Sequence, residues 1–103
     1  MIKVSVLYPN EEGKKFDMDY YTGKHMPLTH SRLDSMGLLR TEVERGISSA
    51  DPSAPAPFVA IGVLYFNTVE EVHEVFKTHG REVVGDIPNY TDISPQIQIS
   101  EIV

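Results

Sequence analysis

The sequence predicts a single α+β domain whose elements follow one another in the order β-α-β-β-α-β. Apolar residues recur with a period of two in some stretches and with a helical period in others, and glycine or proline lies at the junctions between them. A chain of 103 residues is the size of one domain, so residues 1–103 are expected to fold as one unit around one core.

The chain begins with a strand and a helix. The stretch IKVSVLY, residues 2–8, alternates apolar side chains with lysine and serine, which is typical of a strand. A helix is expected to begin after Asp17, a suitable N-cap. Pro27 cannot donate a backbone hydrogen bond, so the helix should kink or break there and restart with proline in its first turn. Gly37 is expected to end the second piece.

Two strands joined by a long hairpin loop come next. Residues 38–48 alternate in character, and Gly46 among them predicts a β-bulge. Residues 49–57 contain three prolines and small residues, which is typical of an extended loop. The stretch FVAIGVLYF, residues 58–66, is apolar throughout apart from Gly62, so this strand should be covered on both faces.

The second helix is predicted from its start signal. Thr68 and Glu71 have the spacing of a capping box, and apolar residues then recur at helical spacing as far as Phe76. Gly80 is expected to end this helix. A short turn and a loop at Pro88 should precede the last strand, QIQISEIV.

This order is that of the ferredoxin-like split βαβ motif, in which both helices lie on one face of a four-stranded antiparallel sheet. The other face is then bare. Because residues 58–66 are apolar on both sides and Leu7 adds to the second side, we expect an apolar patch that needs a cover. The simplest cover is a second copy of the chain, in a two-fold homodimer that buries on the order of 2,000 Å².

Composition excludes several classes of partner. Fifteen acidic and nine basic side chains give a formal charge of -6, a poor match for nucleic acid or anionic lipid, and no apolar run is long enough to span a membrane. The chain has no cysteine and no signal-peptide pattern, so a cytoplasmic location is expected. No nucleotide-binding motif is present, and no cofactor is expected. The histidines outside residues 16–28 lack metal-ligand spacing, so no metal is expected.

The stretch FDMDYYTGKHMPL, residues 16–28, contains the first candidate site. His25 follows Tyr21 by one helical turn and precedes Leu28 by one, so all three should face the sheet. His25 could exchange a proton near neutral pH, or it could bond a backbone carbonyl freed near Pro27. Tyr21 could donate a hydrogen bond to a substrate oxygen or simply pack in the core, whereas Tyr20 should lie nearer to solvent.

A second candidate stretch is GDIPNYTD, residues 85–92. Asp86 could orient His25 through its carboxylate, and a loop carrying Asn89 and Tyr90 could close a cavity mouth. Ordinary turn chemistry explains the same residue types equally well. Tyr65, at the end of the apolar strand, could reach the cavity or pack, and packing is the commoner outcome for such a residue.

The stretches FDMDYYTGKHMPL and GDIPNYTD together resemble the EthD family, which is named for a role in ethyl tert-butyl ether degradation and belongs to the dimeric α+β barrel superfamily. The resemblance covers essentially the whole chain. It implies a ferredoxin-like protomer, a homodimeric barrel, and a small-molecule cavity between helices and sheet. Related barrels include monooxygenases, lactone isomerases, polyketide cyclases and haem-binding proteins, so the resemblance supplies no single reaction.

Two functional hypotheses follow from the residues and the resemblance. The first is an enzyme of catabolism or secondary metabolism that needs no cofactor, either an isomerase or cyclase or a monooxygenase-like protein, with His25 transferring the proton. The second is a non-catalytic carrier or accessory protein for a small hydrophobic or aromatic metabolite. The expected catalytic residues are His25, Tyr21 and Asp86, and the expected ligand contacts are Tyr65, Asn89 and Tyr90.

Overall fold

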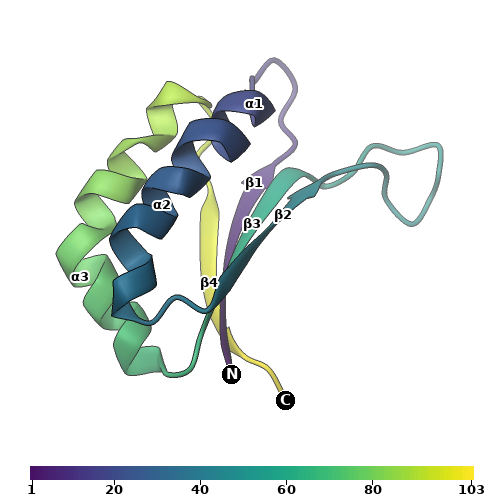
Figure 1. Ribbon diagram of the computed structural model, residues 1–103. Helices are drawn as coiled ribbons and strands as arrows, with labels where there is room; N and C mark the ends of the chain where they lie inside the picture. Colours follow the sequence, from purple (N-terminus) through teal and green to yellow (C-terminus); the bar gives the residue numbers. More distant parts are fainter.

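The chain, seen in a computed structural model that describes all 103 residues, folds as a four-stranded sheet with helices on one face (Figure 1). The strands lie in the order β2-β3-β1-β4, and every neighbouring pair is antiparallel. The ferredoxin-like architecture predicted from the order of the elements is therefore confirmed. The strands are β1 (Ile2–Pro9), β2 (Arg40–Arg45), β3 (Phe58–Phe66) and β4 (Gln96–Glu101).

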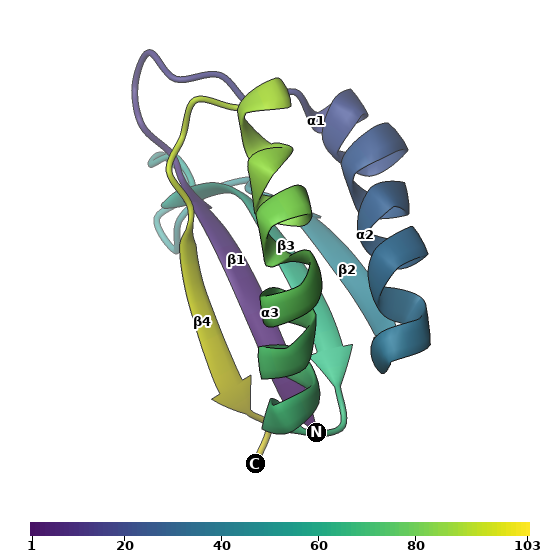
Figure 2. The same ribbon diagram turned by 90° about the vertical axis from the view of Figure 1, so that its left-hand side faces the viewer.

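The helical layer consists of two long segments that run side by side over the sheet (Figures 1 and 2). The first joins a short α-turn, a π-helical turn, an α-helix and a 3-10 turn in direct succession, and the second is one α-helix followed by a 3-10 turn. The elements are α1 (Met18–Tyr20), η1 (Tyr21–His25), α2 (Met26–Leu33), η2 (Asp34–Met36), α3 (Val69–Gly85) and η3 (Ile87–Asn89).

The signals predicted for the first helical segment are present, and a π-turn accompanies the proline. The Asp17 carboxylate accepts a hydrogen bond from the backbone N–H of Tyr20 at 3.1 Å and caps α1. Pro27 lies in the first turn of α2, directly after the π-turn, in which the Met26 N–H bonds the Tyr21 carbonyl five residues back. Gly37 ends the segment with a φ of 108°, a conformation that glycine adopts without strain.

The π-turn changes which residues face the sheet. A π-turn holds about one residue more than an α-turn, so every later side chain is rotated by roughly 100° from its α-helical position. Met26, Thr29 and Leu33 are buried as a result, while Leu28 is only half-buried. The expectation that Leu28 would share the buried face of His25 was therefore wrong.

The second helix is longer than its sequence predicts. The capping box of Thr68 and Glu71 is present, but α3 continues through Gly80 and ends at Gly85. One glycine in a helix interior costs only about 1 kcal/mol relative to alanine, and the buried face formed by Val72 and Val75 outweighs that. Phe76 lies at the edge of this face and remains 36% exposed.

The β2–β3 connection also differs from the prediction. β2 pairs in continuous register with β3 from Arg40 to Arg45, so there is no bulge at Gly46. A Cβ at Gly46 would instead collide with the carbonyl oxygen of Phe58, which explains the glycine as a point of close backbone approach. The register irregularity occurs in β1, between Tyr8 and Pro9. The proline-rich loop projects away from the body of the molecule (Figure 1).

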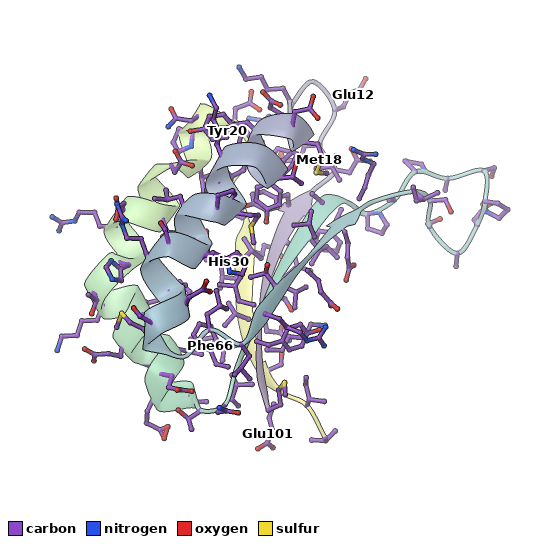
Figure 3. All side chains as sticks on the ribbon, in the orientation of Figure 1. Glu12, Met18, Tyr20, His30, Phe66 and Glu101 are labelled. Carbon is purple, nitrogen blue, oxygen red and sulfur yellow. The ribbon has the colours of Figure 1, made fainter.

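The core lies between the helices and the sheet, in two adjoining clusters, and Figure 3 shows Phe66 in this space. One cluster is aliphatic with a single phenylalanine, and the other is built around Tyr8, Tyr21 and Tyr90. None of the helices has the length and apolar character needed to cross a lipid bilayer.

The open face of the sheet, opposite the helices, is less apolar than expected. Leu7 and Ile61 are half-buried there, and Val63 is fully covered by its neighbours within one protomer. Ile97 and Ile99, by contrast, are 46% and 37% exposed on the helix side of β4, which α3 leaves partly uncovered (Figure 2).

Candidate functional site

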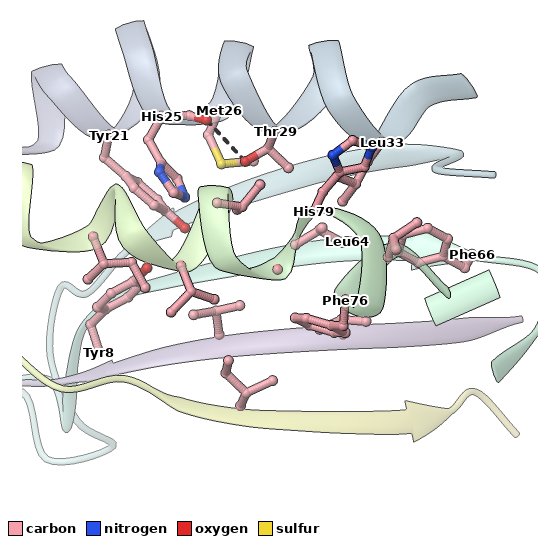
Figure 4. Close-up of a pocket in the computed structure, with 18 residues that line it drawn as sticks. Tyr8, Tyr21, His25, Met26, Thr29, Leu33, Leu64, Phe66, Phe76 and His79 are labelled. Carbon is pink, nitrogen blue, oxygen red and sulfur yellow. Dashed lines mark hydrogen bonds between the residues drawn. The ribbon is translucent and has the colours of Figure 1, made fainter. Parts of the chain in front are cut away.

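A pocket lies between the helices and the sheet (Figure 4). It measures about 60 Å³ for the centre of a water-sized sphere, several times what one water molecule needs. Fourteen of its 18 lining residues are hydrophobic. The side chains that contribute polar atoms come from Tyr8 in β1, Tyr21 and His25 in η1, Thr29 in α2 and His79 in α3.

His25 has one ring nitrogen bonded and the other free. Its residue is 5% exposed, and Nδ1 lies 3.0 Å from Oδ2 of Asp86. Nε2 makes no hydrogen bond to the protein. Every fully buried side-chain nitrogen or oxygen in the structure does have a hydrogen-bond partner, so Nε2 is not one of the fully buried atoms. Nε2 must therefore border accessible space, which agrees with the place of His25 in the pocket wall.

Asp86 lies directly after α3 and is held from three sides. Its Oδ1 accepts hydrogen bonds from the Tyr20 hydroxyl at 2.8 Å and the Asn89 amide at 2.9 Å, and its Oδ2 faces His25. Burial alone would raise the pKa of Asp86, but the hydrogen bonds from Asn89, His25 and Tyr20 together lower it below its ordinary value. Asp86 is thus an anion at neutral pH.

The charge of Asp86 sets the tautomer of His25. A carboxylate only accepts hydrogen bonds, so Nδ1 carries the hydrogen and the lone pair of the neutral ring is on Nε2. Burial lowers the pKa of His25 below its ordinary value, and the hydrogen bond to Asp86 offsets only part of that effect. At neutral pH the ring is therefore a neutral base whose lone pair faces the pocket.

His30 shows the contrasting arrangement. Its Nδ1 lies 2.8 Å from the Asp34 carboxylate, and its Nε2 lies 2.8 Å from the Thr41 hydroxyl. With both ring nitrogens bonded, His30 ties α2 to strand β2 and has no nitrogen free for a ligand (Figure 3).

Aromatic rings surround His25. Tyr21 stacks on it with ring centroids 5.4 Å apart and an interplanar angle of 15°, and Tyr90 lies 4.7 Å away. The Tyr90 hydroxyl is 2.6 Å from the Tyr8 hydroxyl. Burial raises the pKa of Tyr8, Tyr21 and Tyr90, so all three hydroxyls keep their protons at neutral pH.

Gly62 makes room for one of these hydroxyls. A Cβ at Gly62, in the middle of β3, would collide with the Tyr21 hydroxyl. Glycine inside a strand costs backbone entropy and forgoes a packing side chain. The missing side chain lets the Tyr21 ring reach from the helix to the sheet, with its hydroxyl at the floor of the pocket.

The residues expected to form the site are distributed in three ways. Tyr21 and His25 line the pocket. Asp86 and Tyr90 do not line the pocket, but both contact His25. Asn89 does not line it either and is linked to His25 through Asp86. Tyr65 lies on the open face of the sheet, where its hydroxyl bonds Glu42 at 2.9 Å. Tyr65 does not line the pocket, contrary to expectation. Successive side chains of a strand point to opposite faces, so its neighbours Leu64 and Phe66 line the pocket instead.

Two residues of the site were missed by sequence analysis. Tyr20 was expected near solvent from its angular offset to Tyr21, but its hydroxyl reaches Asp86 along the surface. Tyr8 shares its side of the first strand with Ile2 and Val4, which indicated burial but not a role for its hydroxyl. No cluster of three or more His, Cys, Asp or Glu side chains could hold a metal ion.

Solved structures of known proteins resemble this fold. An EthD-like protein from Ralstonia eutropha JMP134 is 42% identical, with a TM-score of 0.92 over 99% of this chain and 91% of that one. The chain belongs to the EthD family. No family model matches this EthD-family sequence, and no curated protein is similar to it.

More distant structures share the fold of this EthD-family protein. An ethyl tert-butyl ether degradation (EthD) family protein from Bacillus halodurans C-125 is 21% identical, with a TM-score of 0.70 over 100% of this chain and 99% of that one. A dimeric ferredoxin-like protein from an uncultured marine organism is 11% identical, with a TM-score of 0.63 over 100% and 95% of the two chains.

Proposed function

We propose that this EthD-family protein binds a small, largely apolar molecule between its helices and its sheet, and that His25 exchanges a proton with it. One observation carries the proposal: Asp86 holds Nδ1 of His25 at 3.0 Å, which leaves Nε2 as the free nitrogen at the wall of an apolar pocket. The contrast with His30, whose two nitrogens are both bonded, supports a chemical role for His25.

The proposed reaction is a proton transfer without a cofactor, of the isomerase or cyclase type. Nε2 of neutral His25 takes a proton from an acidic C–H or O–H bond of the ligand, and the electron pair of that bond stays on the ligand. The Asp86 carboxylate stabilises the imidazolium that forms. Return of the proton to a different ligand atom completes the rearrangement and restores neutral His25. Asp86 is a positioning residue here, because it acts through His25.

The second candidate is a carrier that holds a metabolite without changing it. The apolar lining favours this reading, since 14 of 18 wall residues are hydrophobic and binding needs nothing more. In a carrier, His25 and Tyr21 would serve as polar anchors for one end of the ligand.

A deuterium-exchange experiment tests the proposal. The ligand that co-purifies with the protein is identified by mass spectrometry and incubated with fresh protein in D₂O. We expect wild-type protein to exchange an acidic C–H hydrogen of the ligand for deuterium, and His25→Gln to bind the ligand but exchange this hydrogen about 10²- to 10⁴-fold more slowly. His73→Gln, on the exposed face of α3, is the matched control and should behave as wild type. Equal exchange by His25→Gln would refute the role of His25, and no exchange by wild type would favour the carrier.

We further propose that two copies pair through the open face of the sheet. Ile61 of β3 lies opposite Leu7 of β1 in the middle of this face, and charged side chains such as Arg40 and Glu42 lie toward its rim. An apolar centre with a polar rim is the usual composition of a protein interface. The similar fold of a dimeric ferredoxin-like protein supports a dimer.

A further inference from the structure

The pocket has two unlike ends (Figure 4). Tyr8, Tyr21 and His25 lie together at one end, and Phe66 and Phe76 lie at the other. Thr29 lies between them, but its hydroxyl already donates to the His25 carbonyl at 3.0 Å. The groups able to bind a ligand oxygen are therefore concentrated at the tyrosine end.

The tyrosine end has at least one hydroxyl proton to spare. Tyr8, Tyr21 and Tyr90 carry three hydroxyl protons, and a chain of three hydroxyls uses only two of them internally. The hydrogen bond between Tyr8 and Tyr90 accounts for one, and a contact between Tyr8 and Tyr21 would account for a second. When Tyr90 donates to Tyr8 and Tyr8 donates to Tyr21, the third proton is that of Tyr21, which lines the pocket, and it is available to an acceptor on the ligand.

The pocket contains no permanently charged cation that would pair with an anion. No lysine or arginine lines it, and its two histidines, His25 and His79, are its only side chains able to become cationic. A carboxylate or phosphate buried beside neutral His25 would have no counter-ion, which is strongly unfavourable. A neutral oxygen, such as that of a phenol or a ketone, meets no such penalty.

The apolar end opens to the surface between α3 and β4. Phe76 and Ile97 line the pocket here and are 36% and 46% exposed. Gly80, also in the lining, gives α3 no side chain at this point. The pocket volume of about 60 Å³ is smaller than the ~150 Å³ cavity known to admit benzene, so an aromatic ligand must extend outward through this mouth.

We propose that the ligand is a neutral, flat, mostly apolar compound with one phenol or ketone oxygen, and that it binds with this oxygen against Tyr8 and Tyr21. Its apolar end then lies under Gly80 and reaches the mouth between α3 and β4. This inference rests on the binding part of the proposed function and does not require the proton transfer.

Three naphthalene compounds of similar size test the ligand class. Fluorescence titration of the full chain compares 2-naphthol, naphthalene and 2-naphthoate. We expect 2-naphthol to bind about tenfold more tightly than naphthalene, because of one hydrogen bond to the tyrosines. We expect 2-naphthoate to bind more weakly than either. Equal binding of 2-naphthol and naphthalene, or tighter binding of 2-naphthoate, would overturn the proposal.

Tyrosine variants test the orientation of the ligand. Tyr8→Phe and Tyr21→Phe should each reduce the preference for 2-naphthol over naphthalene while leaving naphthalene binding intact. Tyr65→Phe removes a hydroxyl on the open face and should change neither the preference for 2-naphthol nor the binding of naphthalene. A preference that survives in both pocket variants would place the oxygen elsewhere.

Glycine variants test the mouth. A Cβ at Gly80 would meet only Phe76 carbons at 3.6 and 3.8 Å, so Gly80→Ala should fold and bind both compounds as wild type does. Gly80→Leu should weaken 2-naphthol and naphthalene equally, because the larger side chain fills the path. Unchanged binding by Gly80→Leu would refute the proposed path. His25→Gln should retain naphthalene binding, so a failure of proton transfer is distinguishable from a failure of this inference.

Discussion

His25 and His30 lie on the same helical segment and face the same layer, yet their surroundings give them different chemistry. His30 has both ring nitrogens bonded, whereas His25 has one bonded to Asp86 and one open to the pocket. Proton transfer needs a nitrogen that is both oriented and free. At the residue scale, the carboxylate behind His25 decides which nitrogen is free and how readily it takes a proton.

Replacing the carboxylate should alter the titration of His25 in a defined direction. In Asp86→Asn the charge that raises the His25 pKa is lost while burial still lowers it, so the pKa should fall below its wild-type value. An NMR titration of the ring carbon protons measures this change. Asn89→Ala, which removes a neutral donor to Asp86, is the control and should shift the His25 pKa less. An Asp86→Asn pKa at or above that of wild type would contradict the assigned pairing.

The lowered pKa of His25 in the folded protein makes stability depend on pH. Because the folded-state pKa of His25 lies below its unfolded value, the unfolded chain binds the proton first as the pH falls. Stability is therefore lost from about pH 6.5 downward, until the folded-state pKa is passed. Asp86, whose pKa is also lowered, adds a loss of stability at more acidic pH. In Asp86→Asn the pH range over which protonation of His25 lowers stability should extend to lower pH, because the folded-state pKa of His25 is lower still.

At the element scale, the π-turn η1 brings the helix into register with the pocket. It allows Tyr21, His25 and Met26 all to be buried, which a regular α-helix with the same neighbours would not. Thr22, Gly23 and Lys24 on its outer side are exposed. The extra residue is thus accommodated on the solvent side, while the inner side keeps its contacts.

Deleting Gly23 should turn the π-turn into an ordinary α-turn. Residues before the deletion would rotate by roughly 100° relative to α2, so Tyr21 should lose its stacking on His25 and the free energy of unfolding should fall by about 1–3 kcal/mol. Urea denaturation and the His25 titration together measure both effects. Gly23→Ala keeps the residue count, and its Cβ would meet nothing within 4 Å, so it should resemble wild type. A deletion variant with wild-type stability and titration would show that the π-turn is dispensable.

The elements differ in how far the sequence could predict them. Local signals, such as the Asp17 cap, the capping box at Thr68 and the αL glycine Gly37, correctly predicted where helices begin or end. Gly46 and Gly80 were misread. Gly46 marks a close backbone approach and not a bulge, and the packing of α3 on the sheet carries the helix past Gly80. The π-turn has no local signal beyond Pro27, so the rotation that removes Leu28 from the buried face was not predictable.

For the candidate site, the sequence suggested that Asp86 could orient His25 but could not establish their contact. They are 61 residues apart in the chain, and only the packing of η1 beside the end of α3 brings them to 3.0 Å. The hydroxyl contacts of Tyr8 and Tyr20 likewise depend on tertiary packing. Tyr65 was a candidate ligand contact because it lies at the end of the apolar strand, and the alternation of side chains along β3 places it on the open face of the sheet.

At the scale of the whole molecule, the open face of the sheet is the surface through which we propose that two copies pair. Ile61→Asp places a charge in the middle of this face, and we expect it to convert a dimer into a folded monomer because a carboxylate buried there would lack a partner. Light scattering measures the mass. Ile47→Asp, at an 85% exposed loop position, is the control and should remain dimeric. A monomeric wild-type protein would contradict the proposed pairing.

The contacts of the site also have a consequence for the order in which the chain is made. The bonds that join Tyr8 to Tyr90, Tyr20 to Asp86 and His25 to Asp86 span 82, 66 and 61 residues. A ribosome delivers the N-terminal partner of each pair long before the C-terminal one. The nascent chain therefore lacks the candidate site until nearly all of its residues have emerged.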